Sequence, residues 1–338
     1  MSERGRTNEA GRWQRTQRVF TLCAALAVPA CDAPRGGADA PADAPARHRI
    51  VLITHGQSSD PFWSVVSNGA HAAARQLGAV VEYQAPLRFD MVEMSQLIDA
   101  ARVSRPDGII VSIPDADALS AAIRAATGAG IPVLSINSGD DVSRGLGALA
   151  HIGQPEYQAG EGAGERLAAS GVTHALCVNH EVGNIALDRR CDGLRDALAR
   201  AGARARVIAV DLADPDDAEQ RIAGALTTDA SIDGMLTLGP AAIDPALAAL
   251  RSSGRAARVR FGTFDLTPRA LDALREGSLA FAIDQQPYLQ GWLAVALLVN
   301  YLESRTMAGG GRVIATGPAF VTREEADAIA ALVQRGIR

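Results

Sequence analysis

Hydrophobic and polar residues follow two alternating patterns along most of the chain. Within residues 49–54, Ile50 to Ile53 are all apolar, which is typical of a strand buried on both faces of a parallel sheet. From Asp60-Pro61 onward, apolar residues recur every three or four positions, which is typical of an amphipathic helix that Asp caps and Pro begins. The strand–helix unit repeats to the end of the chain, and such repeats predict parallel sheets with helices on both faces.

The two patterns predict where the individual elements lie. Strands are predicted at residues 49–54, 79–83, 108–113, 132–136, 173–179, 205–210, 233–238, 258–263, 280–284 and 312–315. Helices are predicted at residues 61–77, 90–104, 116–127, 155–169, 184–200, 215–227, 241–252, 268–276, 287–303 and 323–334. Because the rhythm restarts after residue 154, we predict an α/β protein with two doubly wound parallel-sheet lobes. Ligands of such folds bind beyond the carboxyl ends of the strands.

Composition supports a folded chain of about two domains. The chain has 338 residues, of which 48% are hydrophobic and 21% are charged, so it can bury a large core. This composition excludes a disordered protein and a small disulfide-dense protein. All 33 basic residues are Arg, and they are spread evenly rather than clustered, so we expect no nucleic-acid partner.

The first 47 residues differ in character from the rest. Residues 1–30 contain five Arg, two Glu and a short apolar stretch, which predicts a secretory signal peptide. Val28-Pro29-Ala30-Cys31 resembles a lipobox, so we predict lipidation of Cys31; ordinary cleavage near Ala30 is the alternative. Residues 31–47 are rich in Pro, Ala, Asp and Gly and are expected to form a disordered tether. These features predict a periplasmic protein held on a membrane by a lipid.

Export would place Cys177 and Cys191 in an oxidising compartment, where disulfides can form. They can form a disulfide between a strand and the next helix, or remain two buried thiols. We favour the buried thiols, because free Cys is among the most buried residue types.

Polar and aromatic residues gather where the predicted strands end. Aromatic rings offer flat apolar faces to the C–H side of a sugar, while amides and carboxylates bind its hydroxyls. This mixture suits a neutral, polyhydroxylated ligand. The residues that follow strand ends include Asp60, Phe62, Trp63, Ser112, Asn137, Ser138, Asn179, His180, Glu181, Asn184, Gly239, Pro240, Asp265, Asp284, Gln285 and Gln286.

Five short segments carry a family resemblance, and their order and spacing are more specific than any one of them. They are residues 59–63 (SDPFW), 106–111 (PDGIIV), 130–133 (GIPV), 264–268 (FDLTP) and 283–287 (IDQQP). The chain from residue 48 to 335 resembles periplasmic sugar-binding proteins of the ribose-binding type, which are the type I periplasmic binding proteins of ABC importers.

The resemblance implies two lobes joined by a three-crossover hinge, with crossovers near residues 151–154, 284–287 and 313–318. Lobe one would comprise residues 48–152 and 286–314, and lobe two residues 153–285 and 315–338. It further implies a monomer that binds a sugar or small polyol between its lobes and docks on membrane permease subunits. We expect no catalytic residue, no cofactor and no metal.

The resemblance also implies which residues bind the ligand. Phe62 and Trp63 would stack on a ring, and Asp265 and Gln285 would bind hydroxyls. Asp60 stands where the ribose binder has Asn, and Asn137 where it has Asp. Arg190 matches a family Arg. A second family Arg aligns near Asp188, and Ser138 stands where the family has an Arg after its Asp. The loss of two Arg argues against ribose. The stretch from Gly239 to Ala242 resembles the corresponding segment of receptors of the autoinducer-2 group, whose backbone groups there meet a small ligand.

Other functions fit the residues less well. A receptor that feeds a chemoreceptor or another sensor instead of an importer stays open as an alternative. Thr54-His55-Gly56 is superficially similar to a phosphatase signature, but that chemistry needs Arg in place of Thr54. Gly160, Gly162 and Gly164 lie within a helical pattern, which favours close helix packing over a dinucleotide-binding loop. A signal peptide, not a helix-turn-helix, precedes the first lobe, which disfavours a sugar-responsive repressor.

Overall fold

The computed structural model describes residues 48–56 and 60–338. The predicted signal peptide, the predicted lipidation site Cys31 and the predicted tether lie outside the described residues and stay predictions. Among the helices that the structure describes, none is both long and apolar enough to cross a bilayer.

The first sheet has six parallel strands in the order β11-β5-β4-β3-β1-β2. Its strands are β1 (His48–Ile53), β2 (Ala79–Gln84), β3 (Gly108–Ser112), β4 (Val133–Ile136), β5 (His151–Gly153) and β11 (Val313–Ala315). The order β2-β1-β3-β4-β5 reverses direction beside β1, which is the point at which open α/β sheets bind ligands.

The second sheet repeats this plan in the order β12-β10-β9-β8-β6-β7. Its strands are β6 (His174–Asn179), β7 (Arg204–Ala209), β8 (Gly234–Thr237), β9 (Arg260–Phe264), β10 (Phe281–Asp284) and β12 (Ala319–Val321). All pairs are parallel except β10 with β12, which is antiparallel. The two sheets confirm the predicted pair of doubly wound lobes.

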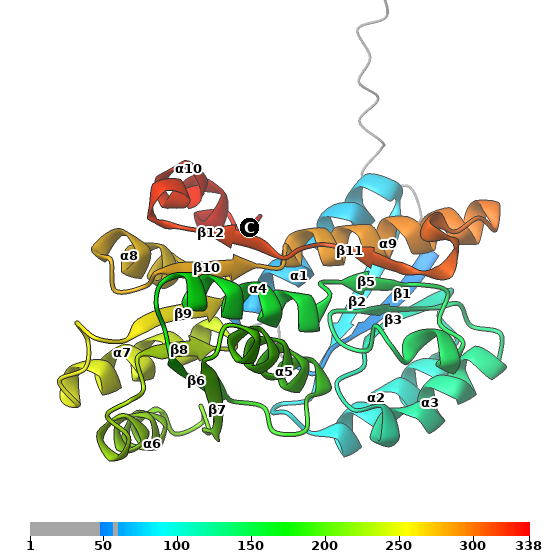
Figure 1. Cartoon of the computed structure of the whole chain (residues 1–338). Helices are drawn as coiled ribbons and strands as arrows, with labels where there is room; N and C mark the ends of the chain where they lie inside the picture. The colour runs from blue at the N-terminus through cyan, green and yellow to red at the C-terminus, as the bar shows by residue number, and fades with distance from the viewer. Residues whose placement is uncertain (1–47, 57–59) are drawn as a thin grey trace, which may run out of the picture. The chain divides into compact units, whose positions relative to one another are not determined.

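Helices cover both faces of each sheet. In the first lobe, apolar side chains of α1 and α9 pack on one face of the sheet and those of α2 and α3 on the other. In the second lobe, α4 and α5 cover one face, while α6, α7, α8 and α10 cover the other (Figure 1). The helices are α1 (Pro61–Leu77), α2 (Met91–Ser104), α3 (Ala116–Gly128), α4 (Glu156–Ala169), α5 (Ile185–Arg200), α6 (Pro215–Thr228), α7 (Ile243–Ser252), α8 (Pro268–Glu276), α9 (Pro287–Ser304) and α10 (Arg323–Gln334).

The described chain passes from one sheet to the other three times. It leaves the first sheet after β5, returns to it between β10 and α9, and leaves it again between β11 and β12. The strands β5 and β12 are missing from the predicted elements. Each is only three residues long, and so short a segment gives no dependable hydrophobic period, although the equally short β11 was predicted.

Helices α4 and α5 pack closely in the second lobe because glycines line their contact. A Cβ atom on Gly160 would lie 2.0 Å from the carbonyl oxygen of Arg190, and one on Gly193 would lie 2.0 Å from that of Tyr157. This geometry agrees with the packing role predicted for the glycines of α4. It brings the first turn of α4 beside the middle of α5.

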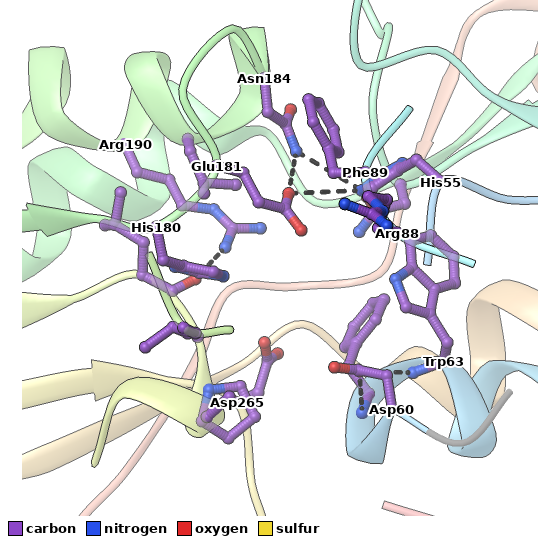
Figure 2. A pocket seen from close by; sticks show the side chains of 18 of the residues that line it. His55, Asp60, Trp63, Arg88, Phe89, His180, Glu181, Asn184, Arg190 and Asp265 are labelled. Atoms are coloured by element: carbon purple, nitrogen blue, oxygen red, sulfur yellow. Dashed lines mark hydrogen bonds and ion pairs between the residues drawn. The ribbon is translucent and has the colours of Figure 1, made fainter. Parts of the chain in front are cut away.

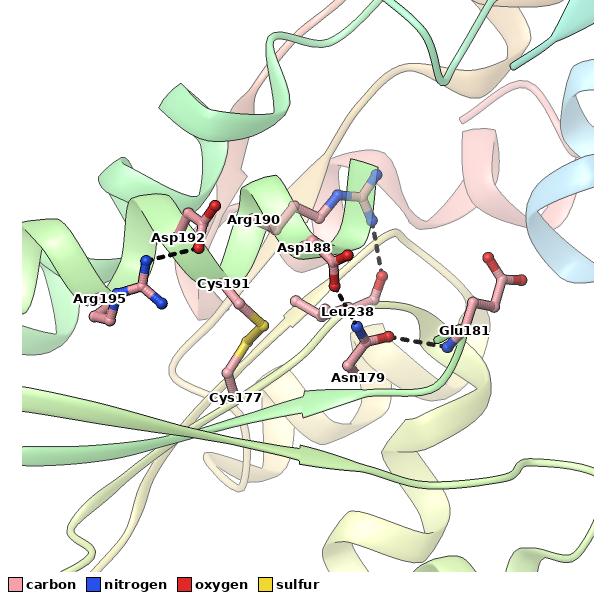
Figure 3. Close-up of a disulfide and its surroundings, with 9 residues drawn as sticks. All are labelled: Cys177, Asn179, Glu181, Asp188, Arg190, Cys191, Asp192, Arg195 and Leu238. Atoms are coloured by element: carbon pink, nitrogen blue, oxygen red, sulfur yellow. Dashed lines mark hydrogen bonds and ion pairs between the residues drawn. A yellow bond between two sulfur atoms is a disulfide. The ribbon is translucent and has the colours of Figure 1, made fainter. Parts of the chain in front are cut away.

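The prediction that Cys177 and Cys191 are free thiols is wrong. Their sulfur atoms are 2.05 Å apart, and the disulfide joins β6 to α5 (Figure 3). Both side chains are buried, as predicted, but the packing of α5 on β6 places their Cα atoms 6.0 Å apart, within reach of a bond. The tertiary contact, which the residue types alone did not reveal, decides the pairing.

Candidate ligand-binding site

A cavity of about 400 Å³ lies where the carboxyl ends of strands from both lobes meet. Its size is within the range of cavities that hold small molecules. The lining residues come from both lobes (Figure 2) and are His55, Asp60, Phe62, Trp63, Arg88, Phe89, Asn137, His180, Glu181, Asn184, Leu187, Arg190, Asp211, Leu212, Ala213, Leu238, Gly239, Pro240, Ala241, Asp265 and Gln285.

The wall from the first lobe is mainly aromatic. Asp60 caps α1 by accepting hydrogen bonds from the backbone N–H groups of Phe62 and Trp63, at 2.8 and 3.3 Å. The cap fixes the first turn of the helix, so both rings emerge at the cavity. Trp63 meets Phe62 and His55 edge-to-face, with ring centroids 4.9 and 4.8 Å apart. Phe89 lies edge-on to His55 at 5.8 Å, so rings surround one side of the cavity.

The wall from the second lobe is mainly polar. Asn184 caps α5 by accepting a hydrogen bond from the N–H of Ala186, and its amide donates to Glu181 Oε2 at 2.7 Å. The backbone of Glu181 is held as well, because its N–H donates a hydrogen bond to Asn179 Oδ1. These bonds hold the loop between β6 and α5 in place, and Glu181 points into the cavity (Figure 2).

Arg190 is a buried cation on the same wall. Its Nε and Nη2 donate to the two carboxylate oxygens of Glu156, at 2.6 and 2.9 Å, and its Nη1 donates to the carbonyl of Leu238 at 2.8 Å. The guanidinium also stacks on the ring of Phe264, 4.2 Å from its centroid. Burial opposes the charge, but Glu156 still keeps the pKa of Arg190 above its ordinary value. Arg190 is therefore charged and firmly positioned.

A chain of hydrogen bonds forms the floor of the cavity and crosses between the lobes. The amide of Asn137 donates to Gln285 Oε1 at 3.1 Å, and Gln285 Nε2 donates to Asp265 Oδ1 at 2.8 Å. Asn137 and Asp265 both have positive φ angles, 61° and 69°. Residues other than Gly adopt a positive φ only at a cost in free energy, and such residues cluster at functional sites. The backbone thus turns both polar groups toward the cavity.

Burial changes the protonation of several lining groups. It raises the pKa of Asp265 to about 7, against the attraction of Arg190 and the hydrogen bond from Gln285. It also raises the pKa of Asp60, and the nearby Glu181 adds to this effect. Burial lowers the pKa of His180 to about 4 and lowers that of His55, so both imidazoles are neutral at pH 7. The cavity therefore offers neutral imidazoles beside carboxyl groups that are reluctant to ionise.

The two lobes touch at the cavity mouth. Asn184 Nδ2 of the second lobe lies 3.4 Å from His55 Nε2 of the first, and Glu181 Oε2 lies 3.7 Å from the same nitrogen. Ser112 holds the other side of the ring, with its Oγ 2.9 Å from His55 Nδ1. His55 is 4% exposed, so this contact encloses one side of the cavity.

The structure brings together all but one of the predicted ligand-binding residues: Asp60, Phe62, Trp63, Asn137, Arg190, Asp265 and Gln285. Asp188 is absent from the lining; it is exposed and accepts a hydrogen bond from Asn179. The reason is helical geometry, because Leu187 and Arg190 face the cavity and Asp188 lies about 100° around the helix from Leu187.

Asp265 does not cap α8. The cap is Thr267, whose hydroxyl accepts a hydrogen bond from the N–H of Ala270 at 3.1 Å. Asp265 is 5% exposed and its carboxylate points into the cavity (Figure 2).

Several lining residues were not among the predicted ligand-binding set. His180, Glu181 and Asn184 follow the end of β6, and the strand-end pattern did single them out, but the resemblance did not assign them to the ligand. Arg88 and Phe89 precede α2 in a loop, and no local pattern distinguishes them from ordinary loop residues. Within residues 48–56 and 60–338, no three His, Cys, Asp or Glu side chains are placed to hold a metal ion.

Two parallel-sheet lobes with a ligand-sized cavity at the carboxyl ends of their strands define a type I periplasmic binding protein. The sequence agrees, since residues 50–306 match the periplasmic binding protein domain family. The chain belongs to that family, whose members bind solutes.

Individual relatives bind sugars or polyols. A carbohydrate transporter from Acidothermus cellulolyticus 11B, solved with myo-inositol, is 36% identical; the match covers 86% of this chain and 99% of that one, with a TM-score of 0.82. A periplasmic sugar-binding protein from Legionella pneumophila is 26% identical over 80% of this chain and 100% of that one, with a TM-score of 0.75. The xylose/arabinose-binding protein of Sulfolobus acidocaldarius is 28% identical over 81% of this chain and 71% of its own length.

Proposed function

We propose that the protein is the substrate-binding receptor of an ABC importer and that it holds a neutral sugar or ring polyol between its lobes. One observation carries this proposal: the cavity combines an aromatic wall from one lobe with hydrogen-bonding groups from the other. The rings suit the apolar face of a sugar ring, and the amides and carboxyl groups suit its hydroxyls. The protein performs no chemistry on its ligand.

Binding and closure are coupled in this proposal. The ligand contacts both walls only when the lobes are close, so it stabilises the closed state by the difference in its affinity for the two states. The floor chain from Asn137 through Gln285 to Asp265 links the lobes at the hinge and orients both polar groups. Permease subunits would then recognise the closed form.

The relatives suggest which ligands to try first. myo-Inositol leads, because it is the ligand of a structure 36% identical to this chain. Xylose and arabinose follow from the named Sulfolobus acidocaldarius relative. Ribose is disfavoured, because Ser138 and the neighbourhood of Asp188 lack two Arg of the ribose binders.

An autoinducer-2-like small molecule is the second candidate ligand. With such a ligand, the protein would be a receptor that feeds a sensor instead of an importer. Gly239, Pro240 and Ala241 line the cavity, so backbone groups stand on the wall there, as in receptors of that group.

The direct test is mass spectrometry of small molecules released from protein purified out of cells, followed by calorimetric titration of myo-inositol, D-xylose, L-arabinose, D-ribose and autoinducer-2. We expect one neutral polyol to bind with a micromolar or lower dissociation constant, which corresponds to about 8 kcal/mol of binding free energy or more. Binding of amino acids or peptides alone would contradict the proposal.

We also propose that the protein is a monomer in the periplasm and is anchored to a membrane by a lipid on Cys31. Cys31→Ser would then move it from the membrane fraction to the soluble fraction. Equal membrane association of the variant and the native protein would contradict the anchor while leaving the ligand proposal intact.

A further inference from the structure

The charge of Arg190 is already balanced before any ligand enters. Arg190 and Glu156 are each 3% exposed, and their two parallel hydrogen bonds form the strongest kind of Arg–carboxylate pair. Gln154 donates a third hydrogen bond to Glu156 Oε2 at 2.7 Å and so holds the carboxylate against the guanidinium. Glu156 itself is absent from the cavity lining. It stands behind Arg190, as seen from the ligand.

Carboxyl groups outnumber guanidinium groups on the described wall. Four carboxyl groups line the cavity, from Asp60, Glu181, Asp211 and Asp265, against the guanidinium groups of Arg88 and Arg190. Arg88 and Asp211 are both exposed, so water screens both charges. Figure 2 shows Asp60, Glu181 and Asp265 facing the interior from different sides. Among the described lining residues, no buried cation is left to receive a negative charge.

We propose that Glu156 determines the charge selectivity of the site: by neutralising Arg190 from behind, it makes the cavity reject anionic sugars and polyols and accept their neutral counterparts. This inference rests on the proposed function and narrows its substrate class. Glu156 is a positioning residue, since it acts on the ligand through Arg190.

A neutral site that contains a buried Arg needs a carboxylate to pair with it. A buried guanidinium without a partner is a strong receptor for carboxylates and phosphates, because its planar N–H groups bind them in pairs. Three of the five N–H groups of Arg190 already donate to Glu156 and Leu238, and the other two can still serve uncharged hydroxyls. Sugar acids and sugar phosphates would find no unpaired buried cation among the described lining residues.

The first experiment uses the native protein and pairs of ligands matched in shape. The pairs are D-glucose with D-glucuronate, D-galactose with D-galacturonate, and myo-inositol with myo-inositol 1-phosphate; glucuronamide and galacturonamide control for size without charge. For any pair whose neutral member binds, we expect the anionic member to bind at least about 100-fold more weakly, because burying a charge without a free partner cation costs several kcal/mol.

The second experiment changes Glu156. Glu156→Gln frees the charge of Arg190, so the ratio between neutral and anionic members should fall below about 10-fold. Glu156→Asp keeps the negative charge and should preserve most of the native ratio. Glu161→Gln is the matched control, because it removes a carboxylate from the same helix and from the exposed pair with Arg200, and should leave the ratio unchanged.

Breaking a buried ion pair destabilises the fold. The Glu156→Gln protein is therefore prepared with the neutral sugar or polyol that the native protein binds in the first experiment, which stabilises the folded state by mass action. A native protein that binds the anionic and neutral members within 10-fold of each other overturns the inference, whatever the variants do. A folded Glu156→Gln protein with the native ratio also overturns it. Failure of every neutral sugar and polyol to bind would instead contradict the proposed function itself.

Discussion

The two lobes share one backbone plan and differ in the side chains placed on it. His55 follows β1 and His180 follows the equivalent strand β6, and Asp60 and Asn184 cap the helices that come next. The turns after the equivalent strands β4 and β9 hold Asn137 and Asp265, both with positive φ.

The comparison separates what the fold requires from what the ligand requires. A helix cap needs only a side-chain oxygen that accepts from backbone N–H groups, so Asp60 and Asn184 serve equally well. The remaining differences give the first lobe a wall of rings and the second lobe a buried ion pair beside carboxyl groups. The first wall therefore offers area and shape, and the second offers directional polar contacts.

The second lobe alone has a disulfide among the described residues, and it supports the polar wall. Changing Cys177 and Cys191 to Ala together should lower the free energy of unfolding by about 3 kcal/mol, because the closed loop is about 15 residues long. Ligand affinity should change by less than roughly threefold, since neither sulfur lines the cavity.

Urea unfolding with and without a reducing agent measures this effect. The reducing agent should destabilise the native protein and leave the double variant unchanged. Equal stability of both proteins under oxidising conditions would show that the bond does not form.

Asp265→Ala should weaken binding by about 100-fold, since a buried carboxyl group loses its hydrogen bonds to ligand hydroxyls, each worth about 1.5–3 kcal/mol if charged. Its melting temperature should stay close to native, because the residue does not cap α8. Calorimetric titration gives the affinity.

Thr267→Ala is the control for this variant. It removes the true cap of α8 and should cost about 1 kcal/mol of stability while leaving affinity nearly unchanged. The reverse result, with Thr267→Ala impairing binding and Asp265→Ala only stability, would reassign the two residues.

Protonation of Asp265 should make stability depend on pH. Its folded pKa of about 7 exceeds its ordinary value of 3.8, so between these values the folded state holds a proton that the unfolded state releases. This stabilisation is lost as pH rises toward and through 7, by about 2 kcal/mol between pH 5 and pH 7.

Asp265→Asn isolates this contribution. His55, His151 and His180 have lowered pKa values and act in the opposite direction, since their stabilisation is lost as pH falls below about 6.5, but they are common to both proteins. Between pH 5 and pH 7, the unfolding free energy of the native protein should therefore fall relative to that of Asp265→Asn. A constant difference would mean that Asp265 ionises normally.

The smallest effect is expected on the aromatic wall. Phe62→Leu keeps most of the buried volume but loses the ring face, so affinity should fall by roughly 3- to 10-fold. Phe320→Leu is a matched change in the second lobe, where the ring packs on Phe281 away from the cavity.

Titration calorimetry compares the two variants. Equal affinity of Phe62→Leu and Phe320→Leu would mean that Phe62 is a core residue, and that the aromatic wall is formed by Trp63 and Phe89.

The local pattern was sufficient for most of the fold. Apolar runs and helix caps such as Asp60 act over a few residues, so they mark the strands, the helices and the two-lobe plan in the sequence. The strand-end rule then located most of the cavity, because it follows from the topology of parallel sheets. Asp188 came from the family resemblance instead, and it lies outside the cavity lining because one position along a helix decides which side faces the cavity.

Other features depend on residues far apart in the chain, and only the tertiary structure decided them. The disulfide exists because α5 packs on β6, and the cysteine side chains alone favoured free thiols. The partner of Arg190 is Glu156, 34 positions earlier, because glycines let α4 approach α5 closely. The contact of His55 with Glu181 and Asn184 depends on how the lobes meet. Sequence determined which groups the protein carries, while packing determined which charges are balanced before the ligand arrives.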